Sequence, residues 1–95
     1  MTDIAVLHYQ TTEGRIPYRE WIESLADNTV RAAVLARVDR LAFGNFGDWE
    51  AVGDGVCELR VHLRAGYRVY FAREGRTAVI LLCGGEKRSQ ASDIK

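Results

Sequence analysis

Charged and polar residues recur at alternate positions between Glu58 and Tyr70. Glu58, Arg60 and His62 alternate with apolar residues, and so do Arg68 and Tyr70 a few positions later. Successive side chains of a strand point to opposite faces, so each run predicts a strand with one polar face. The guanidinium group of arginine can bind a phosphate through two parallel hydrogen bonds, and a tyrosine ring can stack on a nucleobase. The two runs therefore predict a surface suited to a phosphate-bearing ligand such as RNA.

Cleavage of RNA by its own 2′-hydroxyl group is a reaction that such a surface could catalyse. A base must take the 2′ proton, cations must stabilise the charge on the phosphorane, and an acid must protonate the 5′ oxygen. Glu58, His62 and Lys87 are the candidates for base and acid. Arg60 and Arg68 would stabilise the charge. The reaction needs no metal ion and no other cofactor.

Each of these features also has a structural explanation. Arginines on strand faces often pair with neighbouring acids, and Glu58 shares a face with Arg60. A lone histidine such as His62 is more often a surface residue than a general base. The pair Gly84 and Gly85 usually just turns the chain, and the residues after it lack the spacing of a P-loop. Both interpretations stay open from the sequence pattern.

A long apolar run should position this surface. Residues 77–83 are apolar at every position after the first, which predicts a central strand covered on both sides. The segment after the glycine pair should bring three more polar residues to the end of the sheet: Lys87, Arg88 and Gln90. With Tyr70, Arg88 and Gln90 are candidate RNA contacts.

The amino-terminal half predicts a strand at residues 4–9 and two helices, at 17–26 and 29–43. Asp27 or Asn28 should cap the second helix. The second helix carries an apolar stripe formed by Val30, Val34, Val38 and Leu41. Away from the stripe it carries a basic face, expected to be solvated surface, with Arg31, Arg37 and Arg40.

The element order is β-α-α-β-β-β-β, with a tight turn predicted at residues 53–55 between the first two strands of the second half. It predicts an α+β fold: a small antiparallel sheet with a mixed edge, and an amino-terminal helical hairpin packed on one face. A short carboxy-terminal helix should begin near Ser89. Ninety-five residues fit one domain spanning residues 1–95.

Composition and charge narrow the class of protein. The chain is 47% hydrophobic with a formal net charge of zero, but residues 58–95 hold eight Lys or Arg and four acids, and the preceding residues are acidic. The basic half is thus the half with the predicted site. Cys57 and Cys83 lie in apolar strand patterns, which favours buried, reduced thiols in a cytoplasmic protein. No Cys and His spacing suits a zinc site, and no apolar segment is long enough to span a membrane.

Three short blocks carry a family resemblance: Glu58–Arg60, Gly66–Phe71 and Leu81–Gln90. With the helix around Trp21 and the pair Asp93-Ile94, they make the chain resemble the RelE/ParE superfamily of toxins from bacterial type II toxin–antitoxin systems. It is most similar to the HigB-like branch, the addiction-module killer proteins. The resemblance covers nearly the whole chain and implies a RelE-like fold.

The resemblance implies a small cytoplasmic toxin, an endoribonuclease that cleaves mRNA on the ribosome and so inhibits translation. It implies that a cognate antitoxin, with a helix-turn-helix DNA-binding domain, neutralises the toxin and carries it to operator DNA. On matched positions, Arg60 and Arg68 would contact phosphate or stabilise the transition state, and Lys87 and Gln90 would lie in the basic block that follows the last strand. Two alternatives remain. One is a ParE-like inhibitor of DNA gyrase. The other is a non-toxic module that still binds antitoxin, as expected if the sequence that ends at Lys95 has a shorter carboxy-terminal helix than its relatives.

Overall fold

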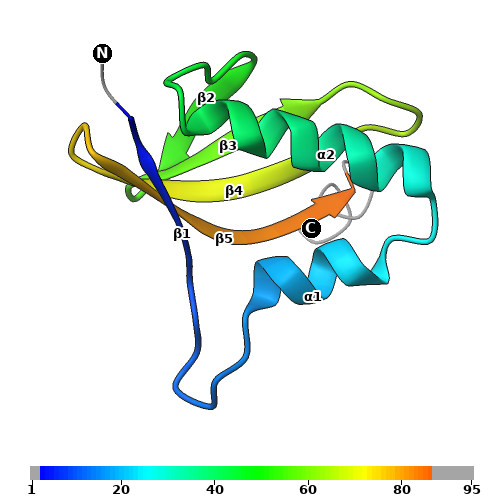
Figure 1. Ribbon diagram of the computed structural model, residues 1–95, viewed down its shortest axis with the longest axis horizontal. Helices are drawn as coiled ribbons and strands as arrows, with labels where there is room; N and C mark the ends of the chain where they lie inside the picture. Colours follow the sequence, from blue (N-terminus) through cyan, green and yellow to red (C-terminus); the bar gives the residue numbers. More distant parts are fainter. Residues whose placement is uncertain (1–2, 87–95) are drawn as a thin grey trace.

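The computed structural model describes residues 3–86, which form two helices and a five-stranded mixed sheet (Figure 1). The elements are β1 (Ala5–His8), α1 (Pro17–Ser24), α2 (Asn28–Leu41), β2 (Trp49–Gly53), β3 (Val56–Val61), β4 (Tyr67–Glu74) and β5 (Ala78–Glu86). The predicted α+β fold and element order are confirmed. The predicted final helix, and with it Lys87, Arg88 and Gln90, lies outside the described residues.

The strand order in the sheet is β1-β5-β4-β3-β2. β2 to β5 pair antiparallel with their neighbours, whereas β1 pairs with β5 in parallel. Figure 1 shows β1 running beside β5 before the chain crosses into α1. The mixed edge that the sequence predicted is therefore the β1 edge. No helix among residues 3–86 is both long and apolar enough to cross a membrane.

Local capping explains where α2 begins. Oδ1 of Asp27 accepts hydrogen bonds from the backbone N–H groups of Thr29 (2.9 Å) and Val30 (3.3 Å), as expected of an N-cap residue. Arg64, in the loop between β3 and β4, donates from Nε to Oδ2 of the same carboxylate at 2.6 Å. Burial favours a higher pKa for Asp27, but these three donors together lower it. The cap thus joins the helix to the sheet.

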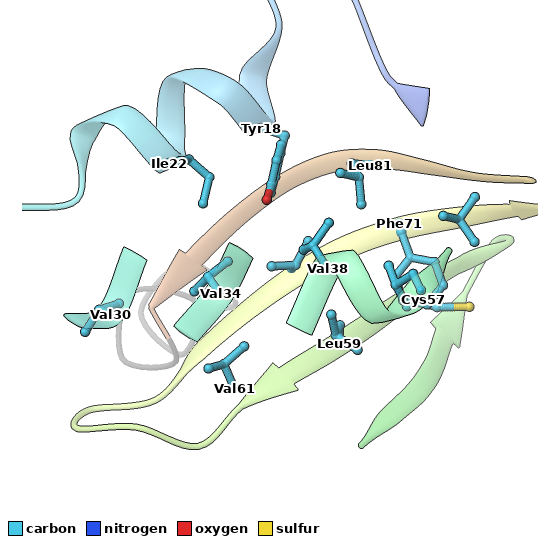
Figure 2. Close-up of a cluster of buried hydrophobic side chains, with 13 residues drawn as sticks. Tyr18, Ile22, Val30, Val34, Val38, Cys57, Leu59, Val61, Phe71 and Leu81 are labelled. Atoms are coloured by element: carbon cyan, nitrogen blue, oxygen red, sulfur yellow. The ribbon is translucent and has the colours of Figure 1, made fainter. Parts of the chain in front are cut away.

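The core lies between the two helices and one face of the sheet (Figure 2). The predicted stripe of α2 is buried, and Tyr18 and Ile22 of α1 lie beside it. The sheet contributes the alternate, inward-facing residues Cys57, Leu59, Val61, Val69, Phe71, Val79 and Leu81. Each fully buried aliphatic side chain contributes about 1.5–3 kcal/mol, so this layer fixes which face of the sheet meets the helices.

A β-bulge in β5 changes which side chains reach the core. Phe71 pairs with Leu81, but Tyr70 pairs with Cys83, so Leu82 is an extra residue in the ladder. An extra residue exchanges the two faces of the strand beyond it. Cys83 consequently lies on the face away from the helices, where it is exposed. The prediction that this cysteine is buried was wrong, because it assumed that both faces of the strand are covered.

The same bulge places Gly84 on the helix-facing side, opposite Val69. A Cβ atom built there would lie 2.5 Å from Cδ2 of Trp21 and closer still to two other ring atoms. The glycine therefore lets the indole ring of α1 lie directly on the backbone of β5. Gly84 and Gly85 are both inside β5, so the pair does not turn the chain, although that is the usual structural explanation of such a pair.

The apolar run of β5 is not covered on both faces within the described part of the chain. Val79 and Leu81 are buried, but Ile80 and Leu82 are only partly buried. β5 is an inner strand of the sheet, as predicted, yet the described helices pack on one face alone. The prediction of cover on both sides was wrong for residues 3–86, because both helices follow the same face.

Candidate functional site

The predicted polar residues lie together on the sheet face opposite the helices. Arg60 and Arg68 are direct partners across β3 and β4, and Glu58 and Tyr70 are partners two residues along. Across β2 and β3, Glu50 is the partner of Glu58. Paired residues of neighbouring strands project from the same face. The sheet register, which sequence alternation alone could not determine, thus brings these five side chains side by side.

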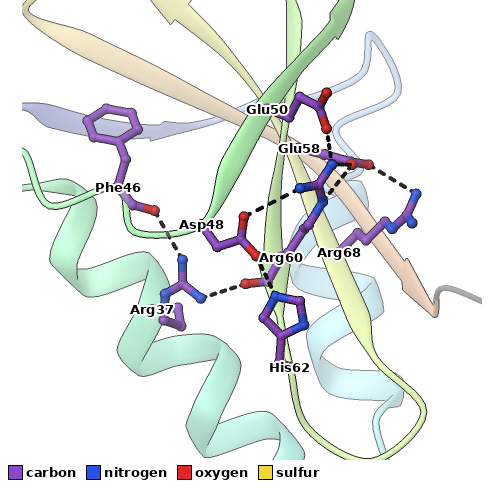
Figure 3. Close-up of polar contacts among 8 residues, drawn as sticks. All are labelled: Arg37, Phe46, Asp48, Glu50, Glu58, Arg60, His62 and Arg68. Carbon is purple, nitrogen blue, oxygen red and sulfur yellow. Dashed lines mark hydrogen bonds and ion pairs between the residues drawn. The ribbon is translucent and has the colours of Figure 1, made fainter.

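Glu58 is the centre of this cluster and is 3% exposed. Its Oε2 atom accepts from Nε of Arg60 (3.0 Å) and lies 2.9 Å from Nη2 of the same guanidinium. Its Oε1 atom accepts from Nη1 of Arg68 at 3.1 Å (Figure 3). Both carboxylate oxygens are therefore engaged by arginines. This geometry suits Glu58 to the positioning of two guanidinium groups. It suits Glu58 less well to proton transfer.

Arg60 also contacts two other carboxylates. Its Nη1 atom lies 3.4 Å from Oδ1 of Asp48, and its Nη2 atom pairs with Glu50. The hydrogen bonds that Arg60 donates to Glu50 and then to Glu58 raise its pKa. Arg60 is thus held by three acids, and 30% of its side chain remains exposed. A phosphate approaching this arginine would meet those carboxylates as well.

His62 lies at the end of the same polar row and makes a contact that the sequence did not reveal. Its Nε2 atom faces Oδ2 of Asp48, while 71% of its side chain is exposed. The hydrogen bond with His62 is the main cause of a lowered pKa at Asp48, and the charge of Arg60 adds to it, although partial burial acts against both. Asp48 was missed because it sits in a turn-rich segment with no periodic pattern.

The loop that carries Asp48 is held by α2. Arg37 donates from Nη1 to the backbone oxygen of Arg60 (2.5 Å) and from Nη2 to that of Phe46 (3.0 Å). Gly47 has a φ of +61°, and a Cβ there would lie 2.6 Å from Nη2 of Arg37. The N–H of Arg60 donates to the backbone oxygen of Asp48 at 2.9 Å. The loop is therefore fixed from both sides, which fixes the Asp48 carboxylate.

The basic face of α2 was predicted to be solvated surface, and for two of its arginines this was wrong. Arg37 is half-buried in the contacts just described. Arg31 donates from Nε to the backbone oxygen of Ile22 (3.2 Å) and from Nη2 to that of Leu25. Both arginines thus donate to backbone carbonyl groups of other segments of the chain. Sequence periodicity places such residues off the apolar stripe but cannot show what they reach.

An open groove of about 670 Å³ runs along the end of the polar face. Its polar and aromatic lining residues are Asp48, Arg60, His62, Arg64, Tyr67 and Arg68. Arg68 is thus shared by the Glu58 cluster and the groove, with 22% of its side chain exposed. The groove combines three guanidinium groups, one imidazole and one carboxylate in a space large enough for a nucleotide.

Tyr70 does not line this groove. Its hydroxyl group is buried beside Arg68 and makes no hydrogen bond of good geometry with the described residues. Burial raises the pKa of Tyr70, and the neighbouring Arg68 partly offsets the effect. The residue is only partly buried, but it is not among those that line the groove, so it is poorly placed to stack on a nucleobase bound there. The hydroxyl is protonated at neutral pH and is available as a donor.

Within residues 3–86, no group of three or more His, Cys, Asp or Glu side chains is arranged to hold a metal ion. The other sequence-predicted residues, Lys87, Arg88 and Gln90, are outside this range. Glu86, the last described residue, is the partner of Tyr67 at the edge of the groove. The basic block of the sequence therefore starts directly after a residue at that edge.

Comparison with known proteins gives a family match and a sequence relative. Residues 20–95 match the family model described as "Phage derived protein Gp49-like (DUF891)". An uncharacterized protein of Haemophilus influenzae (strain ATCC 51907 / DSM 11121 / KW20 / Rd) is 45% identical over 80 residues, which cover 84% of this chain and 81% of the relative.

The protein is thus of the small α+β type found among toxin–antitoxin proteins, and more particularly the chain belongs to the Gp49-like family. That family is part of the RelE/Gp49-like superfamily and is associated with toxin–antitoxin modules, which implies an antitoxin partner. The resemblance drawn from three short sequence blocks is confirmed at the level of the superfamily. The HigB-like branch remains a prediction.

Proposed function

We propose that this protein is the toxin of a type II toxin–antitoxin pair, of the HigB-like branch, and that it cleaves mRNA without a metal ion. The observation that supports this most is the groove in which Arg60, His62 and Arg68 meet. Arginine and imidazole side chains in one open groove are what transesterification at the 2′-hydroxyl group requires. The proposal treats residues 1–95 as one domain.

Arg68 is the residue that we assign to the scissile phosphate. It lines the groove, and its contact with Glu58 holds one end of the guanidinium so that little side-chain entropy is lost on binding. Arg60 lies beside it and adds positive charge, although three carboxylates share that charge. Glu58 then acts through the two arginines, as a positioning residue.

The remaining roles follow from position in the sequence. Lys87, Arg88 and Gln90 come directly after the residue that pairs with Tyr67 at the groove edge, and we assign them to RNA contact or to charge stabilisation. Lys87 is also a candidate to protonate the leaving 5′ oxygen. Tyr70, whose hydroxyl group is buried and which does not line the groove, would support Arg68 and not stack on a base bound there.

The proposed partners are mRNA on the ribosome, in the cytoplasm, and a cognate antitoxin with a helix-turn-helix domain. Contact with operator DNA would occur only through the antitoxin. Binding of the antitoxin over or beside the groove would block access to Arg68. A gyrase-inhibiting toxin or a non-toxic antitoxin-binding module would have no need for the arginine and histidine groove as a unit.

Induced expression without antitoxin tests the proposal. The wild-type protein should stop growth, halt translation and cut transcripts, and Arg68→Ala should relieve all three effects. Arg76→Ala is the matched control, since Arg76 is an exposed arginine in the turn between β4 and β5, away from the groove. Continued translation in arrested cells would refute the proposal, and accumulation of cleaved DNA would favour gyrase inhibition. Tight antitoxin binding without any growth effect would favour the non-toxic module.

A further inference from the structure

The contact between His62 and Asp48 has the form of a catalytic dyad. His62 follows β3 and Asp48 precedes β2, so the pair forms across the β2–β3 hairpin. Figure 3 shows the imidazole ring turned toward the Asp48 carboxylate at the mouth of the polar cluster. Both residues line the groove that also holds Arg60 and Arg68. A histidine and an acid that only form a surface ion pair would have no need to lie in the same groove as these two arginines.

The chemistry of the contact determines which nitrogen of the ring carries the proton. The pKa of Asp48 is lowered by its partners, so the carboxylate is ionised at neutral pH and can only accept a hydrogen bond. Nε2 of His62 must therefore be the N–H donor toward Oδ2 of Asp48. In the neutral ring Nδ1 is then the unprotonated nitrogen, which is the form that accepts a proton.

Asp48 is fixed more firmly than an exposed acid usually is. Its Oδ1 atom lies 3.4 Å from Nη1 of Arg60, and its backbone oxygen accepts from the N–H of Arg60. Arg37 holds Phe46, two residues before Asp48, through its backbone oxygen. The Asp48 carboxylate thus lies between His62 and Arg60. Rotation of the imidazole ring is limited because its acceptor cannot follow it.

The charged and titratable groups that share the groove with His62 are Asp48, Arg60, Arg64, Tyr67 and Arg68. Each of the three arginines is paired with an acid, Arg60 and Arg68 with Glu58 and Arg64 with Asp27. Asp48 is the carboxylate that contacts the imidazole ring itself.

We propose that His62 is the general base of the RNA-cleaving reaction and that Asp48 is its positioning residue, an inference that rests on the proposed function. Nδ1 of His62 takes the proton of the 2′-hydroxyl group while the 2′ oxygen forms a bond to phosphorus. The bond from phosphorus to the 5′ oxygen breaks, and that oxygen takes a proton from water. The products are a 2′,3′-cyclic phosphate and a 5′-hydroxyl end.

Cleavage kinetics with the purified full-length toxin on ribosome-bound mRNA test the catalytic part. His62→Ala should lower kcat by about 10²-fold to 10⁴-fold, the usual contribution of a general base. Added imidazole should restore part of the rate, because the exposed ring leaves an open space when it is removed. Asp48→Asn should lower kcat by about tenfold or more with KM changed less, and Asp48→Glu should recover part of the loss. His8→Gln and Asp54→Asn are the matched controls, at a histidine and an acid outside the groove.

Nitrogen-15 NMR of the His62 ring tests the positioning part without reference to activity. The wild-type spectrum should show the tautomer protonated at Nε2, and Asp48→Asn should convert it to a mixture. Identical tautomers in the two proteins would overturn the inference. If Arg68→Ala abolishes cleavage while His62→Ala cleaves within twofold of wild type, the dyad is wrong and the proposed function stands. If the wild-type protein cleaves no RNA, both are wrong.

Discussion

Replacing Gly84 with alanine should destabilise the protein although it adds only one methyl group. The new Cβ atom would lie 2.5 Å from Cδ2 of Trp21 and nearer to two other ring atoms. Contacts shorter than about 3 Å between such atoms are not tolerated, so either the indole ring or the strand must move. The ring belongs to α1 and is packed against the core, so its movement would disturb the contact between α1 and β5.

The expected magnitude comes from two opposing effects. Forcing an extra methyl group into a packed site costs about 1–3 kcal/mol. Alanine is itself better than glycine inside a strand by roughly 0.5–1 kcal/mol, because the unfolded chain loses freedom. Gly85→Ala isolates the second effect, because Gly85 is in the same strand with no described atom within 4 Å of a Cβ built on it. The two variants should therefore differ by about 1–3 kcal/mol.

Urea unfolding and thermal melting of the two variants measure this difference. A gap of 2 kcal/mol corresponds to roughly 8–16 °C in Tm for a chain of this size. Shortening the ring in a Trp21→Leu background should remove most of the penalty of Gly84→Ala, which a double-mutant cycle would show. If Gly84→Ala and Gly85→Ala melt within about 2 °C of one another, Trp21 moves without cost and the steric argument is refuted.

Three other substitutions test separate contacts. Arg37→Met should cost about 1–3 kcal/mol in urea unfolding because it removes the donors to the backbone oxygens of Arg60 and Phe46; equal stability of the Met and wild-type proteins would contradict this. The pKa of Asp27 is lowered in the folded state. The ionised Asp27 side chain therefore stabilises the fold above its unfolded pKa of about 3.9, and this stabilisation is lost as the pH falls through the lower folded pKa. Asp27→Asn should flatten the acid side of a plot of unfolding free energy against pH. Burial, with a contribution from an acidic neighbour, raises the pKa of Tyr18 to about 12, so stability should fall as the pH rises above about 10. Tyr18→Phe should reduce that fall, leaving the part that comes from Tyr70, and should change stability little at neutral pH. An ultraviolet titration in which every tyrosine ionises near pH 10 would refute the last expectation.

Much of the fold was predictable because its signals are local. The two-residue alternation from Glu58 onward determines which side chains share a face, since strand geometry has a period of two. Asp27 caps α2 through N–H groups two and three residues away. The turn at residues 53–55 also follows from local chemistry, with Asp54 and Gly55 at positive φ. Each of these features depends on neighbours in the chain, which the sequence displays directly.

The candidate site was predictable only in part. The pattern placed Arg60 and Arg68 on one face, but their direct pairing depends on the register of β3 against β4. It did not reveal that Glu58 would be buried between them. Asp48 gave no signal, because its partner His62 is 14 positions away. Contacts across a hairpin depend on how the strands align, which alternation within each strand does not specify.

By itself, then, the sequence determined the helices, the strands and the polar face, since these arise from short-range propensity and periodicity. The tertiary structure decided how that face is composed. The bulge at Leu82 turned Cys83 outward and put Gly84 under Trp21, and the strand register brought His62 to Asp48. These outcomes depend on packing between segments far apart in the chain, where steric fit and hydrogen-bond partners, and not local preference, select the arrangement.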